Sequence, residues 1–150
     1  MAADCAVNGE SNEMILIKDV PQVPLRRALF TMLTDGQDHN VYGDIPEDAV
    51  LPWITIGGMI FSPIGSKTTV IWQAKANIEA YSDGTQKLEL NEMLNDICTL
   101  VSYYGNSLEI EGYSVIDTEI ETVETEQEST TGYHGTVTAV FKLQKARKTE

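Results

Sequence analysis

The chain has 150 residues, of which 42% are hydrophobic and 22% charged, and its formal net charge at pH 7 is −13. A chain of this size and composition has room for one folded domain with a core and is too short for two ordinary ones. The acidic surplus repels phosphate backbones, so nucleic acid is not expected as a tightly bound ligand.

The sequence predicts neither a membrane span nor a metal site. No stretch reaches the roughly 18 to 20 uninterrupted apolar residues that a spanning helix needs, and Met1 to Gly9 lacks a basic region followed by an apolar core. The cysteines, Cys5 and Cys98, form no CxxC motif and have no nearby histidine. We therefore expect a cytoplasmic protein with no metal and no cofactor, in which Cys98 is a core residue.

The N-terminal half is predicted to contain one short helix and several strands. We expect residues 1–13 to be a flexible arm and Met14 to Ile17 to form a short strand. Pro24 suits the first turn of a helix whose buried face is Leu25, Ala28, Leu29, Met32 and Leu33, and Asp35-Gly36 ends it. Short strands are expected next, at Val41 to Ile45 and at Leu51 to Ile56. The pair Gly57-Gly58 that follows permits a bulge or a close backbone approach. We expect Ser62 to Ser66 to be a loop.

The clearest strand and the longest helix are adjacent in the middle of the chain. From Val70 to Tyr81 apolar and polar residues alternate, and the buried face contains small alanines. The next segment has an apolar stripe at helical spacing, with an N-cap candidate in Ser82 to Thr85 and a stop at Gly105-Asn106. Its members are Leu88, Leu90, Met93, Leu94, Ile97, Leu100, Val101 and Tyr104. We expect this helix to pack over the alanines.

The C-terminal part is predicted to be β structure: Leu108 to Ile110, then Tyr113 to Val123 and Tyr133 to Leu143 as an antiparallel hairpin. Residues 144–150 form a basic tail. The expected fold is therefore one α+β domain over residues 14–143, with an antiparallel or mixed sheet, one long helix packed across it and a short N-terminal helix.

No residue pattern predicts an enzyme. The histidines, His39 and His134, lie in no recognisable catalytic motif, and each fits a solvent-facing position. The stretch Gly65-Ser66-Lys67-Thr68 has the look of a phosphate-binding loop, but it lacks the upstream glycine and leads into a strand. Trp53 and Trp72 lie in predicted strands, where a core role and an interface role both remain open.

Two charged segments are candidate surfaces. Asp117, Glu119 and Glu121 share the parity of one strand, so all three are expected on one side of the sheet. That side is either a merely solvated face, a DNA-facing lumen from which DNA is repelled and can slide, or a docking surface for basic groups. The basic side chains near the C-terminus, of which Lys145, Arg147 and Lys148 are the candidates for a subunit interface, supply such groups.

The order of these segments resembles the tail-completion family of long-tailed bacteriophages, also described as tail terminator or tail-to-head joining proteins. The resemblance covers about Val20 to Leu143. It is carried by five features: the helix Val23 to Leu33, the segment Val41 to Pro46 leading into Leu51 to Gly57, the strand around Ile71-Trp72-Gln73, the helix Leu88 to Tyr104, and a final hairpin ending Thr138 to Leu143.

The resemblance implies a structural, non-enzymatic subunit of a homo-oligomeric ring, hexameric by analogy, located at the tail-neck junction of a virion and assembled in the host cytoplasm. Such a ring caps the tail tube protein, presents its other face to a head connector or stopper protein, and lets DNA pass without specific binding. Two alternatives remain: another head-tail connector component, such as a stopper or minor capsid protein, and a small ligand-binding module or enzyme with a site between the sheet and the long helix.

Overall fold

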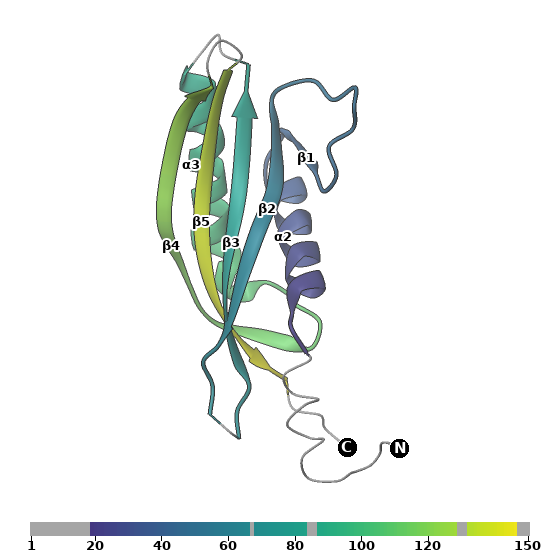
Figure 1. The fold of residues 1–150 in the computed structure, drawn as a ribbon, viewed down its shortest axis with the longest axis vertical. Helices are drawn as coiled ribbons and strands as arrows, with labels where there is room; N and C mark the ends of the chain where they lie inside the picture. Colours follow the sequence, from purple (N-terminus) through teal and green to yellow (C-terminus); the bar gives the residue numbers. More distant parts are fainter. Residues whose placement is uncertain (1–18, 67, 84–86, 129–131, 147–150) are drawn as a thin grey trace.

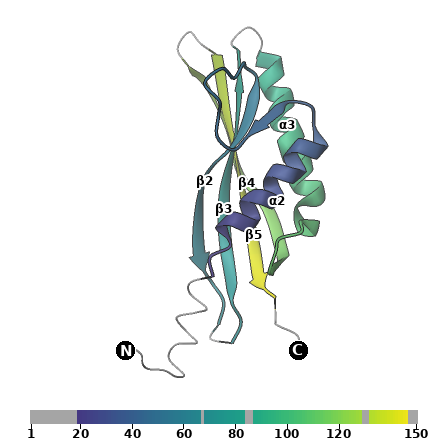
Figure 2. The same ribbon diagram turned by 90° about the vertical axis from the view of Figure 1, so that its right-hand side faces the viewer.

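The computed structural model describes residues 19–66, 68–83, 87–128 and 132–146. Five strands form one sheet in the order β1-β2-β3-β5-β4, and two α-helices cover one face of it (Figures 1 and 2). The only parallel pair within these ranges is β1 with β2, so the sheet is mixed. The elements in chain order are α2 (Gln22–Gly36), β1 (Asn40–Tyr42), β2 (Trp53–Pro63), β3 (Ile71–Ser82), α3 (Lys87–Tyr104), η1 (Gly105–Ser107), β4 (Tyr113–Glu128) and β5 (Gly132–Lys145).

Helix α2 forms as predicted and is a turn longer. Pro24 lies in its first turn, and the first intrahelical bond runs from the Leu25 amide to the Pro21 carbonyl. At the other end the Gln37 side-chain amide donates to the Leu33 carbonyl at 2.8 Å, which satisfies one of the carbonyls that a helix end leaves unpaired. The predicted apolar stripe of α2 is buried against the sheet and α3.

Helix α3 packs across β3, β5 and β4 on most of the apolar stripe that the sequence indicated. The first and last members of that stripe, Leu88 and Tyr104, are instead exposed, at 62% and 48%. Strand β3 alternates between buried and half-buried residues along its whole length, and the buried positions include Ala74, Ala76 and Ala80. Strand β5 contributes Ala139 and Gly135, and a Cβ at Gly135 would overlap the side chain of Leu94. These small residues let the helix backbone approach the sheet closely, which confirms the predicted strand-and-helix unit. The prediction of an α+β fold with one long helix across the sheet is correct.

Several boundaries differ from the prediction. Strand β2 does not end at Gly57-Gly58 but runs on to Pro63, because a register shift between Ile56 and Met59 absorbs the two glycines as a bulge. The guanidinium of Arg26 donates to the carbonyls of Ile56 (2.9 Å) and Gly57 (3.1 Å), so a side chain of α2 holds the backbone where the bulge begins.

Other predicted elements changed length or type. Residues 108–110 form no strand; Ile110 only bridges to Tyr113 across a turn. The two hairpin strands are longer than predicted, ending at Glu128 and Lys145. The expected strand Met14 to Ile17 lies outside the described residues, as do Gly84 and Thr85 of the expected N-cap segment Ser82 to Thr85. No helix of the described ranges is long and apolar enough to cross a membrane.

The close packing of helix on alanine gives a first prediction. Replacing Ala76, which is fully buried under the helix layer, by Leu should lower the free energy of unfolding by about 1–3 kcal/mol, because the added methyl groups overpack the core. Gln73→Leu, on the same strand but on the opposite face, is the matched control and should change it by less than about 0.5 kcal/mol. Urea unfolding measures both. Equal effects would show that the small residues do not set the spacing.

Candidate assembly surface

The second face of the sheet carries no helix, and we call it the open face (Figure 1). Its acidic part lies on β4, the edge strand, which pairs only with β5. Register shifts between Val115 and Asp117 and between Ile120 and Thr122 leave Ile116 and Glu121 without a partner on β5. Each of these bulges interrupts the alternation of side chains along β4, so sequence parity alone does not give the face of a residue.

The register with β5 places the carboxylates of β4. Residues directly opposite one another in an antiparallel pair point to the same face. Asp117 and Glu119 lie opposite Lys142 and Val140, which alternate with the core-facing residues of β5, so both carboxylates lie on the open face. After the second bulge Glu124 and Glu126 oppose Thr136 and His134, and therefore join the same face.

Glu121 also reaches the open face, although it is a bulge residue. Its carboxylate lies 3.1 Å from the ammonium of Lys75 on β3, and both side chains are partly exposed, at 42% and 38%. An ion pair of this exposure contributes about 0–1 kcal/mol. The three carboxylates predicted to share a face, Asp117, Glu119 and Glu121, therefore do so, and Glu124 and Glu126 extend the row.

One end of the open face carries a row of rings across four strands. Tyr42 lies edge-on to Trp53 with centroids 6.2 Å apart, Trp53 lies 5.9 Å from Tyr81, and Tyr81 stacks on His134 at 4.3 Å with an interplanar angle of 5°. The indole N–H of Trp53 is buried and has no hydrogen-bond partner among the described residues. Trp53 thus belongs to this surface row, whereas Trp72 is a core residue at 5% exposure.

A carboxylate joins this row to the acidic strand. Glu79 Oε1 accepts a hydrogen bond from the Tyr81 hydroxyl at 2.8 Å and lies 3.1 Å from His134 Nε2, while Glu126 lies 3.8 Å from His134 Nδ1. The Glu79 carboxylate lies against Gly57, where the Cβ of any other residue would overlap it. The network links β2, β3, β5 and β4 at the same end of the sheet.

The basic segment is divided between described and undescribed residues. Lys145 is the last residue of β5, and its ammonium contacts the carboxylate of Asp19, whose backbone carbonyl accepts a hydrogen bond from the Tyr113 hydroxyl. Burial raises the pKa of the Tyr113 hydroxyl above its usual value. Lys145 is thus engaged within its own subunit, while Arg147 and Lys148 lie outside the described residues.

The remaining sequence candidates take structural positions. His39 follows α2, where its backbone amide donates to the Gln37 side chain at 2.7 Å. Gly65 and Ser66 lie in the turn between β2 and β3, with no helix after them, so this is not a phosphate-binding loop. Burial raises the pKa of the Cys98 thiol. The described residues contain no group of three potential ligands that could hold a metal ion.

Comparison with known proteins identifies the family of this chain and a solved structure with a similar fold. A family model described as "Tail completion protein gp17" matches residues 26–141. The chain belongs to this tail-completion family. Among solved structures 27 chains match; one of them, titled "Virion of native gene transfer agent (GTA) particle", has a TM-score of 0.69 at 12% identity and covers 85% of this chain and 99% of its own. No curated protein matches.

The fold of this tail-completion protein therefore recurs in a chain of a virion particle, and the resemblance stated from the sequence is confirmed. The sequence missed the ring row, and strand parity alone did not place Glu124 and Glu126 on the same face as Asp117 and Glu119. Tyr42, Trp53, Tyr81 and His134 are far apart in the sequence, and only strand order and register bring them together.

The contact between Gly57 and Glu79 gives a second prediction. Gly57→Ala should displace the Glu79 carboxylate from Tyr81 and His134 and lower the free energy of unfolding by about 1.5–3 kcal/mol, the range for hydrogen bonds to a charged group. The matched control is Gly58→Ala, because a Cβ at Gly58 meets no atom within 4 Å.

A double-mutant cycle isolates the cause of this effect. In a Glu79→Ala background the penalty of Gly57→Ala should fall below about 0.5 kcal/mol, since the obstructing carboxylate is gone. A penalty that persists in that background would assign the effect to the bulge backbone instead. Thermal or urea unfolding of the four variants provides the measurement.

Proposed function

We propose that this structural tail-completion protein is a tail terminator subunit. Copies form a ring, hexameric by analogy with the family resemblance, which caps the last ring of the tail tube and offers its other face to the head connector or stopper protein. Membership of the tail-completion family is the observation that carries the proposal. The ring occupies the assembly surface of the tube end, so tube growth stops there. Assembly takes place in the host cytoplasm and the product is the tail-neck junction of the virion.

The unlike edges of the sheet support a ring. One edge is the three-residue β1 beside α2, and the other is the sixteen-residue β4 with its carboxylates. Like charges on β4 disfavour pairing of this edge with itself, which would give a two-fold dimer. Contact between unlike edges is heterologous, and a heterologous contact closes into a ring when its rotation permits.

The open face is our candidate for the lumen. A passage for DNA must not bind it, and carboxylates repel phosphates whereas lysines would hold them. Asp117, Glu119 and Glu121, with Glu124 and Glu126, form such a row on a face free of helices. DNA would cross the ring without specific contacts.

Charge reversal tests the lumen assignment. The double variant Glu119→Lys and Glu121→Lys should leave the ring mass unchanged in native mass spectrometry and reduce infectivity by about tenfold or more, because the added lysines attract passing DNA. Glu92→Lys with Asp96→Lys is the matched control, since it makes the same charge change at exposed positions of α3. If both double variants infect equally well, the open face does not line the passage.

Assembly of tails without this protein separates a terminator from a connector component. Tubes longer than normal in electron micrographs are expected, because nothing occupies the growing end. Tubes of normal length that fail to join heads would contradict the terminator proposal and support a stopper or other connector role. Adding the purified protein back should restore both length and joining.

A further inference from the structure

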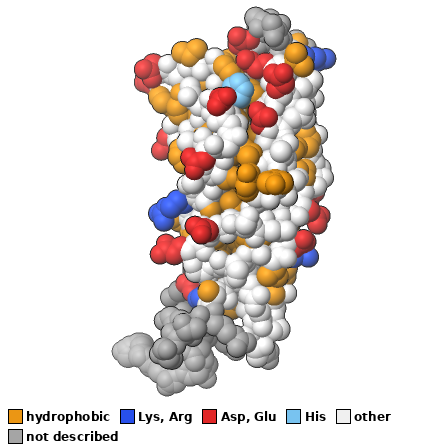
Figure 3. Space-filling view, turned by 180° about the vertical axis from the view of Figure 1, so that it is seen from behind, with side chains coloured by type: hydrophobic (Ala, Val, Ile, Leu, Met, Phe, Trp, Pro, Cys, Tyr) orange, Lys and Arg blue, Asp and Glu red, His pale blue; other side chains and the backbone are white. Residues whose placement is uncertain are grey.

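A small apolar hollow lies between α2 and the edge of the sheet, at the point where β1 ends. Val23 and Phe30 of α2 line it and are 62% and 38% exposed, and Gly43 and Ile56 line it on the side of the sheet. Its volume is about 340 Å³. Figure 3 shows the helix-covered side of the molecule, where hydrophobic side chains are gathered near the middle. Apolar surface of this kind gains free energy when another apolar group covers it.

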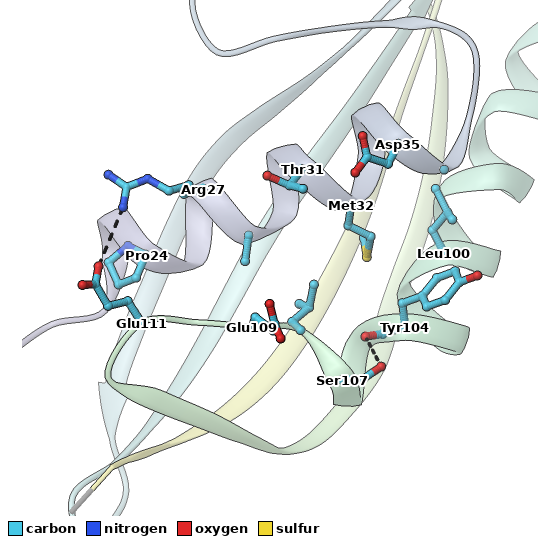
Figure 4. A pocket seen from close by; sticks show the side chains of 13 residues that line it. Pro24, Arg27, Thr31, Met32, Asp35, Leu100, Tyr104, Ser107, Glu109 and Glu111 are labelled. Atoms are coloured by element: carbon cyan, nitrogen blue, oxygen red, sulfur yellow. Dashed lines mark hydrogen bonds and ion pairs between the residues drawn. The ribbon is translucent and has the colours of Figure 1, made fainter. Parts of the chain in front are cut away.

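This hollow differs in charge from the groove on the other side of α2. That groove lies between α2 and α3 and is lined by the carboxylates of Asp35, Glu109 and Glu111. Figure 4 shows it, with Arg27 reaching across to Glu111. In the hollow beside β1 the charged groups among the described lining residues are Arg26 and Arg27, and no carboxylate joins them. In a chain of net charge −13 the hollow is thus a local positive site, complementary to an apolar segment flanked by carboxylates.

The segment Thr122 to Glu126 of β4 has these properties. All five residues are exposed. Val123 lies opposite Val137, a core residue of β5, so it points to the helix-covered side of the sheet, yet it is 47% exposed at this edge of the fold. The next residue, Glu124, has no cationic partner within the described part of the chain. The segment therefore combines an uncovered apolar side chain with an unpaired carboxylate.

The strand registers place the hollow and this segment at the same height in the sheet. Ile56 of β2 lies opposite Ile78 of β3, Ile78 opposite Val137 of β5, and Val137 opposite Val123 of β4. In the proposed ring, with equally oriented subunits and strands along the axis, β4 of one copy meets the β1 and β2 edge of the next copy. Val123 of one copy then comes level with the hollow beside Ile56 of the next.

We propose that Val123 of one copy enters the hollow between Val23 and Phe30 of the next copy, where Glu124 faces Arg27. This contact rests on the proposed ring and names the surfaces that close it. Both surfaces are buried in every subunit, because each copy offers its hollow to one neighbour and its β4 edge to the other. The helix layer also continues around the ring, since α2 of the next copy covers the exposed part of β4.

The two arginines have different parts in this contact. Arg26 donates to two carbonyls of β2, at 2.9 and 3.1 Å, so its charge is fixed at the wall of the hollow. Arg27 is 68% exposed, and its ion pair with Glu111 is 3.8 Å long. Water screens a pair of this exposure, and it holds neither group strongly. Arg27 can therefore exchange Glu111 for Glu124 of the neighbouring copy.

Disulfide formation between copies tests the contact. A Cys5→Ser chain that carries both Val123→Cys and Phe30→Cys is oxidised under mild conditions and run on a non-reducing gel. Because the contact is heterologous, each copy joins two neighbours, and a ladder that ends at the mass of the ring is expected. Chains with only one of the two substitutions should give no ladder. Thr99→Cys with Val123→Cys is the matched control and should also give none, since residue 99 is exposed on α3 outside the hollow.

A charge exchange tests the ionic part of the contact. Arg27→Glu and Glu124→Lys should each weaken association of the copies by about tenfold at low salt, because each brings like charges together. The chain with both substitutions should associate like the unchanged protein, since the pair is restored with its signs reversed. Native mass spectrometry over a range of concentrations measures this. Glu92→Lys, at an exposed position of α3, is the control for the change of net charge.

The outcomes separate this contact from the ring itself. Rings that form while the paired cysteines give no ladder would overturn the contact and leave the ring in place, as would a charge exchange without restoration. A covalent dimer of the chain with Val123→Cys alone would indicate that β4 meets itself in a two-fold contact, which contradicts both. A chain that remains monomeric at every concentration and on tube ends would contradict the ring, and the contact with it.

Discussion

The spacing between helix α3 and the sheet is the constraint on which the rest of the structure depends. Ala74, Ala76 and Ala139 lie beneath the helix layer, and Gly135 lies directly under Leu94. A helix that approaches so closely buries the apolar side chains from Leu90 to Val101 on the side of β3, β5 and β4. Because α2 then packs beside α3 on the same side, the apolar residues of both helices share one core, and the opposite face of the sheet is left for polar and charged side chains.

The helix-covered face of the sheet and the open face therefore have different roles. Stability resides in the helix side, where side chains are buried and substitutions affect packing. The open face has no core to protect, so β4 tolerates two bulges and a row of like charges at its edge. Both features also protect an exposed edge from indiscriminate pairing with other strands. A subunit of a closed assembly needs such protection, because its edges must meet only the intended neighbour.

The sequence predicted the elements whose patterns are local. The alternation of β3 and the helical stripe of α3 are each visible within one segment, and both are confirmed. The sequence allowed a bulge at Gly57 and Gly58 but did not predict that β2 continues beyond it, since that depends on the partner strand. Parity placed Asp117 and Glu119 together correctly, but only the bulge at Glu121 brings Glu124 and Glu126 to the same face.

The contacts of Asp19 with Lys145 and Tyr113 have a geometric consequence for any assembly. They join the point where the described fold begins to the strand with which it ends, so the chain enters and leaves at one end of the sheet. The end of β4 at Glu128 and the start of β5 at Gly132 lie at the opposite end (Figure 1). In a ring of equally oriented subunits, all the entry and exit points would therefore lie on one rim and all these strand ends on the other, which makes the two rims chemically different without any further component.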